Sequence, residues 1–448
     1  MTEFLLSSNT TIEDYISIAD YDVEKLYNVD HLDVSETISE LSYLTHDYFR
    51  YYGKFPSKVA KYIIHSLSAA KQIHEGKDFI FDNYNGSGTT MVEAKLADFY
   101  SAGIDINPFG VLAANVKTCN YDVIILEKQF SSLLEKIKSL NLQGENVDLF
   151  PAQMSSPSEQ SAIDSVLKKI YVEFPDVEKW FEDDAILQLS AIKYYILQMP
   201  LSCYRNFFTL AFFAIIRRVS KAYDAEVRPH VNHSKKKRDV ILAFEKKVSE
   251  MIKTMRSWNY ATDKTVISQT QICNNKNYQE VTSFINKIKS EYHKELGLVI
   301  SHPPYLNCFD YIPVYRLKFL WSYGFDEIYD NYSYSQIKQE EIKSYPASRT
   351  QLIYNYFSHN KTAYQIIFDN LRQGGFCCVV IGDCTINKRL FSVHKILIKM
   401  MESIGFIVEK VTYRGTAYGL GRYAYSHKAD YNDKSGGKQD AIIFFRKP

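Results

Sequence analysis

The sequence predicts an α/β fold in which a long helical insertion interrupts a mainly parallel sheet of seven strands. The first observation is a strand, a glycine turn, a helix and a second strand within residues 78–105. This is the βαβ unit from which parallel sheets are built. Strand-like apolar segments return at 265–267, 298–300, 376–381, 406–413 and 441–445, the last two as an antiparallel pair. Between them, residues 120–260 carry apolar residues at three- and four-residue spacing, which indicates helices.

The charges are divided unevenly along the chain. Residues 1–40 carry ten acidic residues and one lysine, whereas residues 201–260 carry thirteen Lys or Arg against five Asp or Glu. This distribution suits a protein that meets a polyanion with one surface, although solvated charged helices would look the same. We therefore divide the chain into an acidic N-terminal lead (1–45), a sheet domain (46–119 and 261–448) and a basic helical insertion (120–260).

The composition excludes several classes of protein. Of 448 residues, 46% are hydrophobic and 23% charged, which are globular values. The longest apolar run, residues 207–216, is far shorter than the ~20 residues of a membrane span, and the first residues lack the pattern of a secretory signal. Seven cysteines without a CxxC pair indicate neither a disulfide framework nor a cysteine zinc site. We expect a cytoplasmic protein with no metal and no membrane contact.

The glycine turn predicts a cofactor site. Gly86 and Gly88 lie between a strand and a helix, where glycine permits a tight turn and lets a ligand approach the backbone. Met91 breaks the GxGxxG pattern, and no GxxxxGK[ST] phosphate loop is present. Asp105 ends the next strand, where a carboxylate can accept both ribose hydroxyls of an adenosine-containing cofactor, or merely cap the next helix. Turn and carboxylate together favour the cofactor.

The segment Ser301-His302-Pro303-Pro304-Tyr305 follows an apolar strand. Prolines at a strand end fix a rigid backbone and leave carbonyls unpaired. A rigid carbonyl, an adjacent side-chain acceptor and an aromatic ring are what the exocyclic amine of a flipped base needs. The same letters elsewhere would more often be a polyproline stretch.

These segments resemble the S-adenosylmethionine-dependent amino-methyltransferases of DNA, the N4-cytosine and N6-adenine family. The turn DNYNGSGTT is similar to the family's cofactor loop, usually DPFxGSGTT, and GIDINP resembles its ribose-binding strand end. SHPPY is similar to the catalytic [D/N/S]PP[Y/F/W] motif, and HDYFRYYGKFPSK to the segment that precedes the cofactor loop. LNCFDYIPVYRLKFLW resembles the stretch after that motif in N4-cytosine members. The resemblance implies a Rossmann-like methyltransferase sheet, S-adenosyl-L-methionine as cofactor, and double-stranded DNA with a flipped target base.

The resemblance also implies roles for individual residues, with two departures from the family pattern. Asn83 and Tyr84 replace the usual Pro and Phe, and His302 stands where Asp, Asn or Ser normally accepts the amine proton. A neutral imidazole has one acceptor nitrogen and could do the same. The cofactor-binding residues implied are Lys54, Phe55, Asp82, Tyr84, Gly86, Gly88, Thr89, Asp105 and Asn107, and the catalytic ones His302, Pro303, Pro304 and Tyr305.

In this family an insertion between the cofactor loop and the catalytic motif reads DNA. Phosphate contacts are therefore expected from Arg217, Arg218, Arg228, Lys235, Lys236, Lys237 and Arg238. The stretch after the motif favours cytosine N4 as the methylated atom. An adenine-N6 enzyme, an RNA base methyltransferase and a catalytically idle DNA-binding relative remain alternatives, and a cognate restriction endonuclease is a possible partner.

Overall fold

The computed structural model describes residues 7–32, 42–140, 142, 157–325, 333–415 and 439–448. Its centre is an eight-stranded sheet in the order β1-β9-β10-β6-β5-β2-β3-β4. Only β10 runs antiparallel to its neighbours β6 and β9, while every other pair in the sheet is parallel. The strands are β1 (Val29–Leu32), β2 (Asp78–Asp82), β3 (Ser101–Asp105), β4 (Ser268–Ile272), β5 (Glu295–Ser301), β6 (Phe376–Gly382), β9 (Ile407–Gly415) and β10 (Gln439–Arg446). The α/β fold with a mainly parallel sheet is confirmed, with eight strands instead of seven.

The eighth strand comes from the acidic N-terminal lead. β1 pairs parallel to β9, and α1 (Ile12–Ile18) and α2 (Val23–Leu26) precede it. Tyr15 of α1 is fully buried and stacks on Phe357, with ring centroids 5.6 Å apart. Residues 11–32 therefore pack on the sheet domain.

Helices cover both faces of the sheet, so β2, β5 and β6 are buried on both sides. Phe79 and Phe81 of β2 face one layer of helices and Ile80 faces the other, as the alternation of a strand requires. The first layer is α12 (Tyr278–Tyr292), α16 (Thr350–Asn370) and α17 (Val393–Ile404). On the opposite face lie α3 (Ser57–Ala69) and α4 (Thr89–Leu96), and α5 (Pro108–Thr118) connects the sheet domain to the helical part. A small hairpin, β7 (Cys384–Ile386) and β8 (Arg389–Phe391), lies outside the main sheet.

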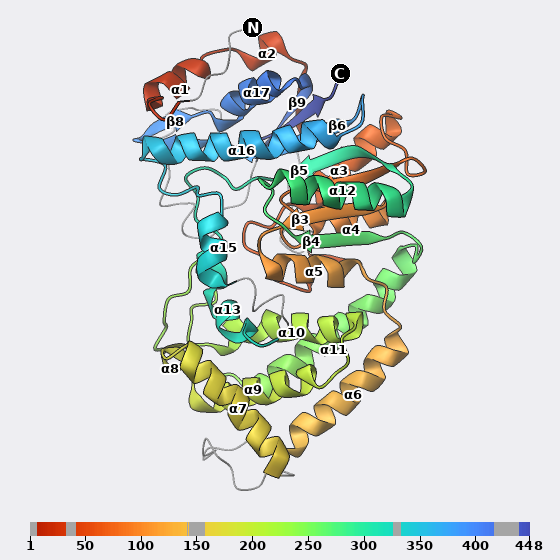
Figure 1. The fold of residues 1–448 in the computed structure, drawn as a ribbon, viewed down its shortest axis with the longest axis vertical. Coiled ribbons are helices and arrows are strands. Elements are labelled where there is room, and N and C mark those ends of the chain that lie inside the picture. The colour runs from red at the N-terminus through yellow and green to blue at the C-terminus, as the bar shows by residue number, and fades with distance from the viewer. Residues whose placement is uncertain (1–6, 33–41, 141, 143–156, 326–332, 416–438) are drawn as a thin grey trace.

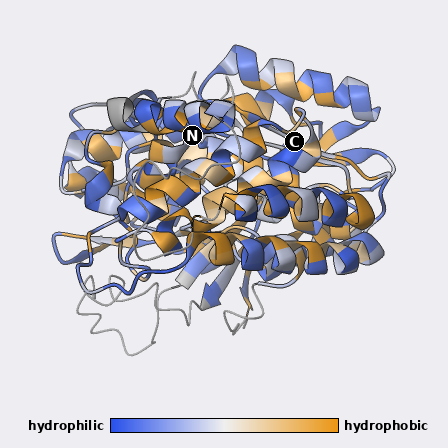
Figure 2. Cartoon of the chain, turned by 90° about the horizontal axis from the view of Figure 1, so that it is seen from below, coloured by the Kyte–Doolittle hydropathy of each residue, from blue (hydrophilic) through white to orange (hydrophobic). Residues whose placement is uncertain are grey.

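The predicted insertion is helical in its described part and forms the lower half of the molecule in Figure 1. Its central helix is buried almost all round, from Phe207 to Ile216. The surrounding helices mix hydrophobic and hydrophilic residues along their length (Figure 2), as amphipathic helices around a shared core do. The helices are α6 (Val123–Ser139), α7 (Pro157–Glu173), α8 (Val177–Trp180), α9 (Asp183–Leu197), α10 (Cys203–Val219) and α11 (Val240–Ala261).

Two segments of the sheet domain contribute to the same helical core. Tyr48, Phe49 and Tyr52 pack into it from the N-terminal side. Trp321 and its neighbours on α13 (Arg316–Ser322) enter it from the stretch after β5, with η2 (Ile312–Tyr315) before them. The short helices η1 (Leu44–Asp47) and α15 (Tyr334–Glu340) flank these segments. The helical unit is thus tied to both the cofactor side and the catalytic side of the sheet.

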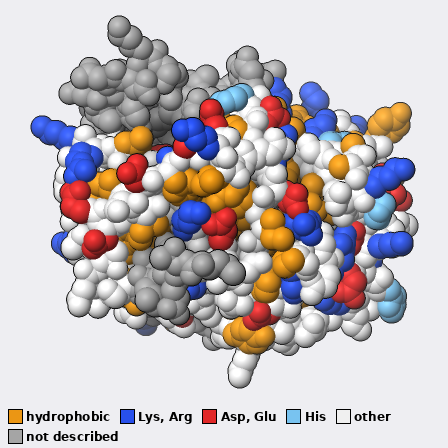
Figure 3. All heavy atoms as spheres, turned by 90° about the horizontal axis from the view of Figure 1, so that it is seen from above, with side chains coloured by type: hydrophobic (Ala, Val, Ile, Leu, Met, Phe, Trp, Pro, Cys, Tyr) orange, Lys and Arg blue, Asp and Glu red, His pale blue; other side chains and the backbone are white. Residues whose placement is uncertain are grey.

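The end of the molecule away from the helical unit mixes Lys and Arg with Asp and Glu (Figure 3). Within the described ranges, no helix is long and apolar enough to cross a membrane. All seven cysteines are free thiols.

Candidate cofactor and target-base site

The glycine turn after β2 is held by two carboxylates. Asp82 Oδ1 accepts a hydrogen bond from the backbone N–H of Tyr84 (2.9 Å), and its Oδ2 accepts one from Thr90 Oγ1 (2.6 Å). Asp105 Oδ2 accepts from the N–H of Gly86 (2.7 Å), and its Oδ1 from the N–H of Asn107 (2.8 Å). Burial raises the pKa of Asp82 to about 7 and that of Asp105 to about 6, and these hydrogen bonds oppose the rise. The turn is therefore shaped before any ligand binds.

The two glycines of the turn have different roles. A Cβ at Gly86 (φ +50°) would lie 3.1 Å from the ring of Tyr51, at the edge of the cavity described below. A Cβ at Gly88 (φ +77°) would lie 2.5 Å from the Cβ and 2.8 Å from the Cα of Ala114 on α5. Gly88 thus permits close packing of α4 against α5, and it does not line the cavity.

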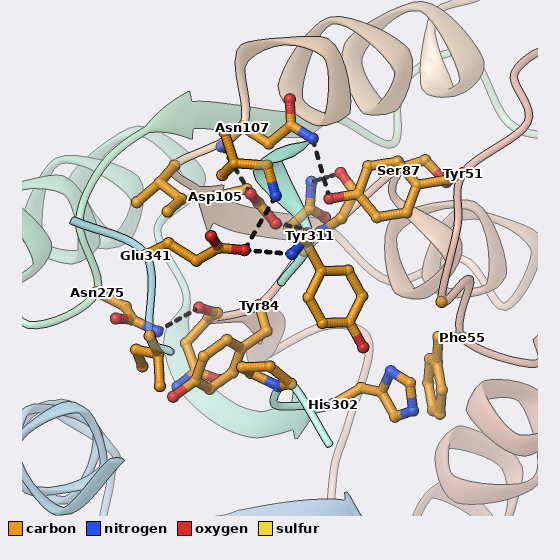
Figure 4. A pocket seen from close by; sticks show the side chains of 18 of the residues that line it. Tyr51, Phe55, Tyr84, Ser87, Asp105, Asn107, Asn275, His302, Tyr311 and Glu341 are labelled. Carbon is orange, nitrogen blue, oxygen red and sulfur yellow. Dashed lines mark hydrogen bonds between the residues drawn. The ribbon is translucent and has the colours of Figure 1, made fainter. Parts of the chain in front are cut away.

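A cavity of about 840 Å³, which includes space open to solvent, lies at the carboxyl ends of β2, β3, β4 and β5. Ligands of open α/β sheets bind at this edge. Figure 4 shows Asp105, Asn107 and Tyr51 on one side of it, His302 and Phe55 on the other, and Tyr311 between them. Of the predicted site residues, the structure brings to its wall Lys54, Phe55, Tyr84, Gly86, Thr89, Asp105, Asn107, His302 and Pro304. Asp82, Gly88, Pro303 and Tyr305 are not part of the wall.

His302 is positioned by aromatic rings on both sides. Its imidazole stacks on Phe55, with centroids 5.0 Å apart and planes 29° apart, and meets Tyr305 edge-on at 5.1 Å. Burial and the positive charge of Arg414 lower the pKa of His302 to about 3. Neither ring nitrogen has a hydrogen-bond partner among the described residues, so a neutral imidazole faces the cavity with its acceptor nitrogen available.

The prolines and Tyr305 complete the strand end. The carbonyl of Pro304 accepts a hydrogen bond from Tyr356 Oη at 2.7 Å, so it is occupied. The Pro303 carbonyl has no hydrogen bond within the described part of the chain. The ring of Tyr305 lies against Gly382, where an added Cβ would come within 2.8 Å of it. Gly382 therefore leaves room for the ring that the sequence assigns to base stacking.

Several residues of the cavity wall were not expected from the sequence. Tyr51 lies in the aromatic segment before the cofactor loop, and Tyr311 comes from the loop after the catalytic motif. Glu341 accepts hydrogen bonds from the N–H groups of Tyr311 and Ile312, the latter at 3.0 Å, and burial raises its pKa to about 7. Asn275 follows β4 and donates to the Asn83 carbonyl at 3.3 Å. A strand end followed by Asn274 and Asn275 is a usable sequence signal, but the sequence interpretation placed that strand three residues too early.

Polar groups of the wall lack partners within the protein. Asn83 is 2% exposed, and neither its Oδ1 nor its Nδ2 has a hydrogen-bond partner among the described residues. The Oδ1 of Asn85 is in the same situation. Buried amides are normally satisfied, so these atoms fit a bound polar ligand. With the half-buried Asp105 carboxylate and the apolar rings of Tyr51 and Tyr84, the wall suits a cofactor that carries both a ribose and an adenine ring.

The cations predicted to contact DNA are placed in different environments. Arg217 donates to the carbonyls of Tyr223 (2.9 Å) and Val227 (2.8 Å), and thereby holds the loop after α10. Lys235 donates to two carbonyls and to Asp224 (2.8 Å) in the same loop, so its ammonium is directed inward. Exposed or half-buried positions are taken by Arg218, Arg228, Lys236, Lys237 and Arg238. Lys237 pairs with Asp184, and Arg238 with Asp224. DNA contact by these residues stays a prediction.

No group of three or more potential metal ligands from His, Cys, Asp and Glu occurs in the part of the chain that the structure describes.

The fold and the site define an α/β protein with a cavity at the carboxyl edge of its parallel sheet, whose wall suits an adenosine-containing cofactor. Residues 14–115 match the N6/N4 methyltransferase family model, described as DNA methylase. The chain is similar to the Type II methyltransferase M.MjaII of Methanocaldococcus jannaschii, with 35% identity over 96 residues, which are 21% of this chain and 17% of that protein. It is also similar to the Type II methyltransferase M.MvaI of Kocuria varians, with 23% identity over 185 residues, 41% of this chain and 36% of that protein.

The match over residues 14–115 supports an N4/N6 amino-methyltransferase segment like that of DNA methylases, a family whose methyl donor is S-adenosyl-L-methionine. The matched parts cover less than two thirds of either relative. The matched family segment includes the glycine turn and Asp105 and ends before the SHPPY motif.

Proposed function

We propose that this protein is a site-specific DNA methyltransferase that methylates the exocyclic amine of a DNA base, cytosine N4. One observation carries the proposal: a single cavity joins the cofactor turn with Asp105 at one end to the neutral His302 at the other. Such a cavity can hold a methyl donor and present it to an amine at the end of β5. The choice of cytosine rests on the resemblance of residues 306–321 to N4-cytosine members.

Cofactor binding is assigned to the side of the cavity on which Figure 4 shows Asp105, Asn107 and Ser87, together with Asn83. Asp105 would accept the ribose hydroxyls, the backbone of residues 85–87 would lie along the cofactor, and the Asn83 amide would gain the partner that it lacks within the protein. When bound, S-adenosyl-L-methionine supplies an electrophilic methyl group on a sulfonium, so no covalent intermediate with the protein is needed. The protein's contribution is then to position and polarise the amine.

The end of β5 holds the target amine. The imidazole of His302 and the carbonyl of Pro303, which lies just outside the cavity wall, would each accept one hydrogen of the NH2 group and leave the nitrogen lone pair free to react. Phe55 stacks on the imidazole and holds it in its plane, and Tyr305, which meets the imidazole edge-on from outside the cavity wall, is the ring that we assign to stacking on the base. As the N–C bond forms, the C–S bond would break and leave a neutral thioether, and the amine nitrogen would become positive; the neutral His302 nitrogen is the group proposed to take the released proton.

The proposal extends to the protein's surroundings. The substrate is double-stranded DNA with the target base flipped out, and the basic helical unit supplies phosphate contacts. The names of the relatives are those of Type II methyltransferases, which supports a restriction–modification role with a cognate endonuclease as partner and a cytoplasmic location.

Nucleoside analysis tests the proposal. The purified protein is incubated with methyl-labelled S-adenosyl-L-methionine and either duplex DNA of mixed sequence or total RNA, and the nucleic acid is digested and chromatographed. Label in N4-methylcytosine is expected from the DNA. Label in N6-methyladenine would refute the choice of base, and label in RNA the choice of substrate. No label from wild type would favour the idle relative. Asp105→Ala is measured alongside wild type, and Glu75→Ala, which changes an exposed carboxylate outside the cavity wall, is its matched control.

A further inference from the structure

A second hollow, lined mainly by cations, lies beside the cofactor cavity. Its charged residues are Arg50, Arg217, Arg218, Arg238, Lys318 and Asp224, which we call the basic pocket. Five cations against one carboxylate enclose a space of about 730 Å³ that includes open solvent. The pocket is assembled from three separate parts of the chain, namely residues 49–52, the α10 region and α13.

Aromatic rings form the apolar part of this wall. The guanidinium groups of Arg50 and Arg217 lie over the ring of Tyr52, at 4.9 Å and 5.2 Å from its centroid. The ammonium of Lys318 lies 5.1 Å from the ring centroid of Phe49 and 5.4 Å from that of Tyr315. These contacts hold the cations in place without neutralising their charge.

Most of these cations already have oxygen partners. Arg217 donates to carbonyls of the loop after α10, Arg238 pairs with the Asp224 carboxylate at 3.1 Å, and Arg50 donates to the Asp224 carbonyl at 2.9 Å. Lys318 is different: it is 7% exposed and has neither a hydrogen bond nor an ion pair among the described residues. A buried ammonium without an anion is costly. Burial, with the charges of Arg217 and Arg50, lowers its pKa to about 7.

We propose that the basic pocket holds a phosphate group of the DNA backbone, with Lys318 at its base and the exposed Arg218 at its rim. The inference rests on the proposed function, because DNA is the polyanion that the function brings to this surface. A phosphodiester offers the two oxygens that the unpartnered ammonium and the rim guanidinium can each contact. This proposal adds Lys318, which lies outside the basic insertion, to the residues predicted to bind DNA.

The location gives this contact a positioning role. Tyr51 lies between Arg50 and Tyr52 in sequence and lines the cofactor cavity, while its two neighbours line the basic pocket. The N–H of Tyr52 donates to Tyr315 Oη at 3.2 Å, which ties this segment to the stretch after the catalytic motif. A phosphate in the basic pocket is therefore held close to the cavity that takes the base. Phosphate contacts fix the register of a duplex on a protein.

The test is the salt dependence of DNA affinity, measured on the full chain with a labelled duplex of arbitrary sequence. Each phosphate contact contributes about −0.9 to the slope of log affinity against log salt. Lys318→Met keeps the apolar stem and should reduce the slope by about 0.9, as should Arg218→Gln, whose exposed position leaves folding intact. Lys318→Arg should restore the wild-type slope. Lys77→Gln, an exposed cation before β2 that lies outside both the basic insertion and the pocket, is the matched control and should change nothing.

The outcomes separate this inference from the proposed function. An unchanged slope in both Lys318→Met and Arg218→Gln overturns it, as does an equal effect of Lys77→Gln. Calorimetric titration with inorganic phosphate forms a second arm: binding that depends on Lys318, together with an unchanged DNA slope, would assign the pocket to a free phosphate and overturn the DNA contact. Methyl transfer at low salt by wild type and Lys318→Met reports on the proposed function separately, since Lys318 lies outside the cofactor cavity.

Discussion

Replacing His302 tests how the site accepts the amine hydrogen. His302→Ala removes one acceptor and leaves the Pro303 carbonyl and Tyr305 in place. Losing such an acceptor typically costs about 1–3 kcal/mol, or roughly 5- to 150-fold in rate if it acts in the transition state. His302→Asp and His302→Ser introduce the residues usual in the family and should retain or raise the rate.

The pH dependence follows from the surroundings of the imidazole. With a pKa of about 3, His302 is neutral throughout the range from pH 5.5 to 8.5. At pH 5.5 a group with that pKa is protonated to well under ~1%, whereas an ordinary histidine with a pKa of ~6.5 would be about 90% protonated. The ratio of wild-type to His302→Ala rates should therefore stay constant over this range.

The assay is single-turnover methyl transfer at saturating DNA and S-adenosyl-L-methionine, with both proteins measured in the same buffers. Asp105, with a pKa of about 6, and Glu341, with a pKa of about 7, are present in both proteins, so their titration cancels in the ratio. A ratio near one at every pH would mean that His302 is not the acceptor. A ratio that falls tenfold between pH 7.5 and 5.5 would mean that its pKa is not lowered, which would refute the buried stacking that we describe.

Three further predictions concern stability. Gly88→Ala should lower the free energy of unfolding by ~2–5 kcal/mol, because a left-handed backbone and a collision with α5 both oppose the new Cβ. Gly76→Ala, where a Cβ would meet open space, should change that free energy little, and denaturant titration compares the two variants. The pKa of His302 is lower in the folded chain than in the unfolded one, so its contribution to the free energy of unfolding falls by up to about 1.4 kcal/mol per pH unit as the pH drops from ~6.5 toward 3. A His302→Phe variant should therefore unfold less readily in acid than wild type. Equal acid sensitivity of the two proteins would contradict this. Lys235→Met should lower the melting temperature by removing three hydrogen bonds, to the carbonyls of Arg217 and Ala222 and to Asp224, while Lys236→Met, at an exposed position, should not. Equal melting temperatures would show that the inward ammonium contributes nothing.

The parts of the fold that depend on local patterns were predictable from the sequence. The glycine turn between β2 and α4 is marked by its glycines, and the helices of residues 120–260 are marked by their regular apolar spacing. β1 was missed, because Val29–Leu32 is four residues long with two exposed polar positions and is a strand only through its pairing with β9. β4 was placed too early, since Ser268–Ile272 is a mostly polar edge strand.

The site was predictable where one motif carries it and not where distant segments meet. Asp105 ends β3, His302 follows β5, and both have recognisable neighbours in the sequence. Tyr311 and Glu341 belong to loops with no regular pattern, and only the folded chain brings them to the cavity. The role of Gly88 also required the structure, because the residue that makes glycine necessary, Ala114, lies on another helix.

Calorimetric titration with S-adenosyl-L-methionine tests most directly whether the cavity beside Asp105 is the cofactor site. Wild type should bind the cofactor, and Asp105→Ala and Asp105→Asn should each bind it at least about tenfold more weakly, since a charged acceptor contributes about 1.5–3 kcal/mol per hydrogen bond. Glu75→Ala should bind like wild type, and thermal melts should show all four proteins folded. Wild-type affinity in both Asp105 variants would contradict the account, because the carboxylate that closes the glycine turn would then play no part in holding the methyl donor.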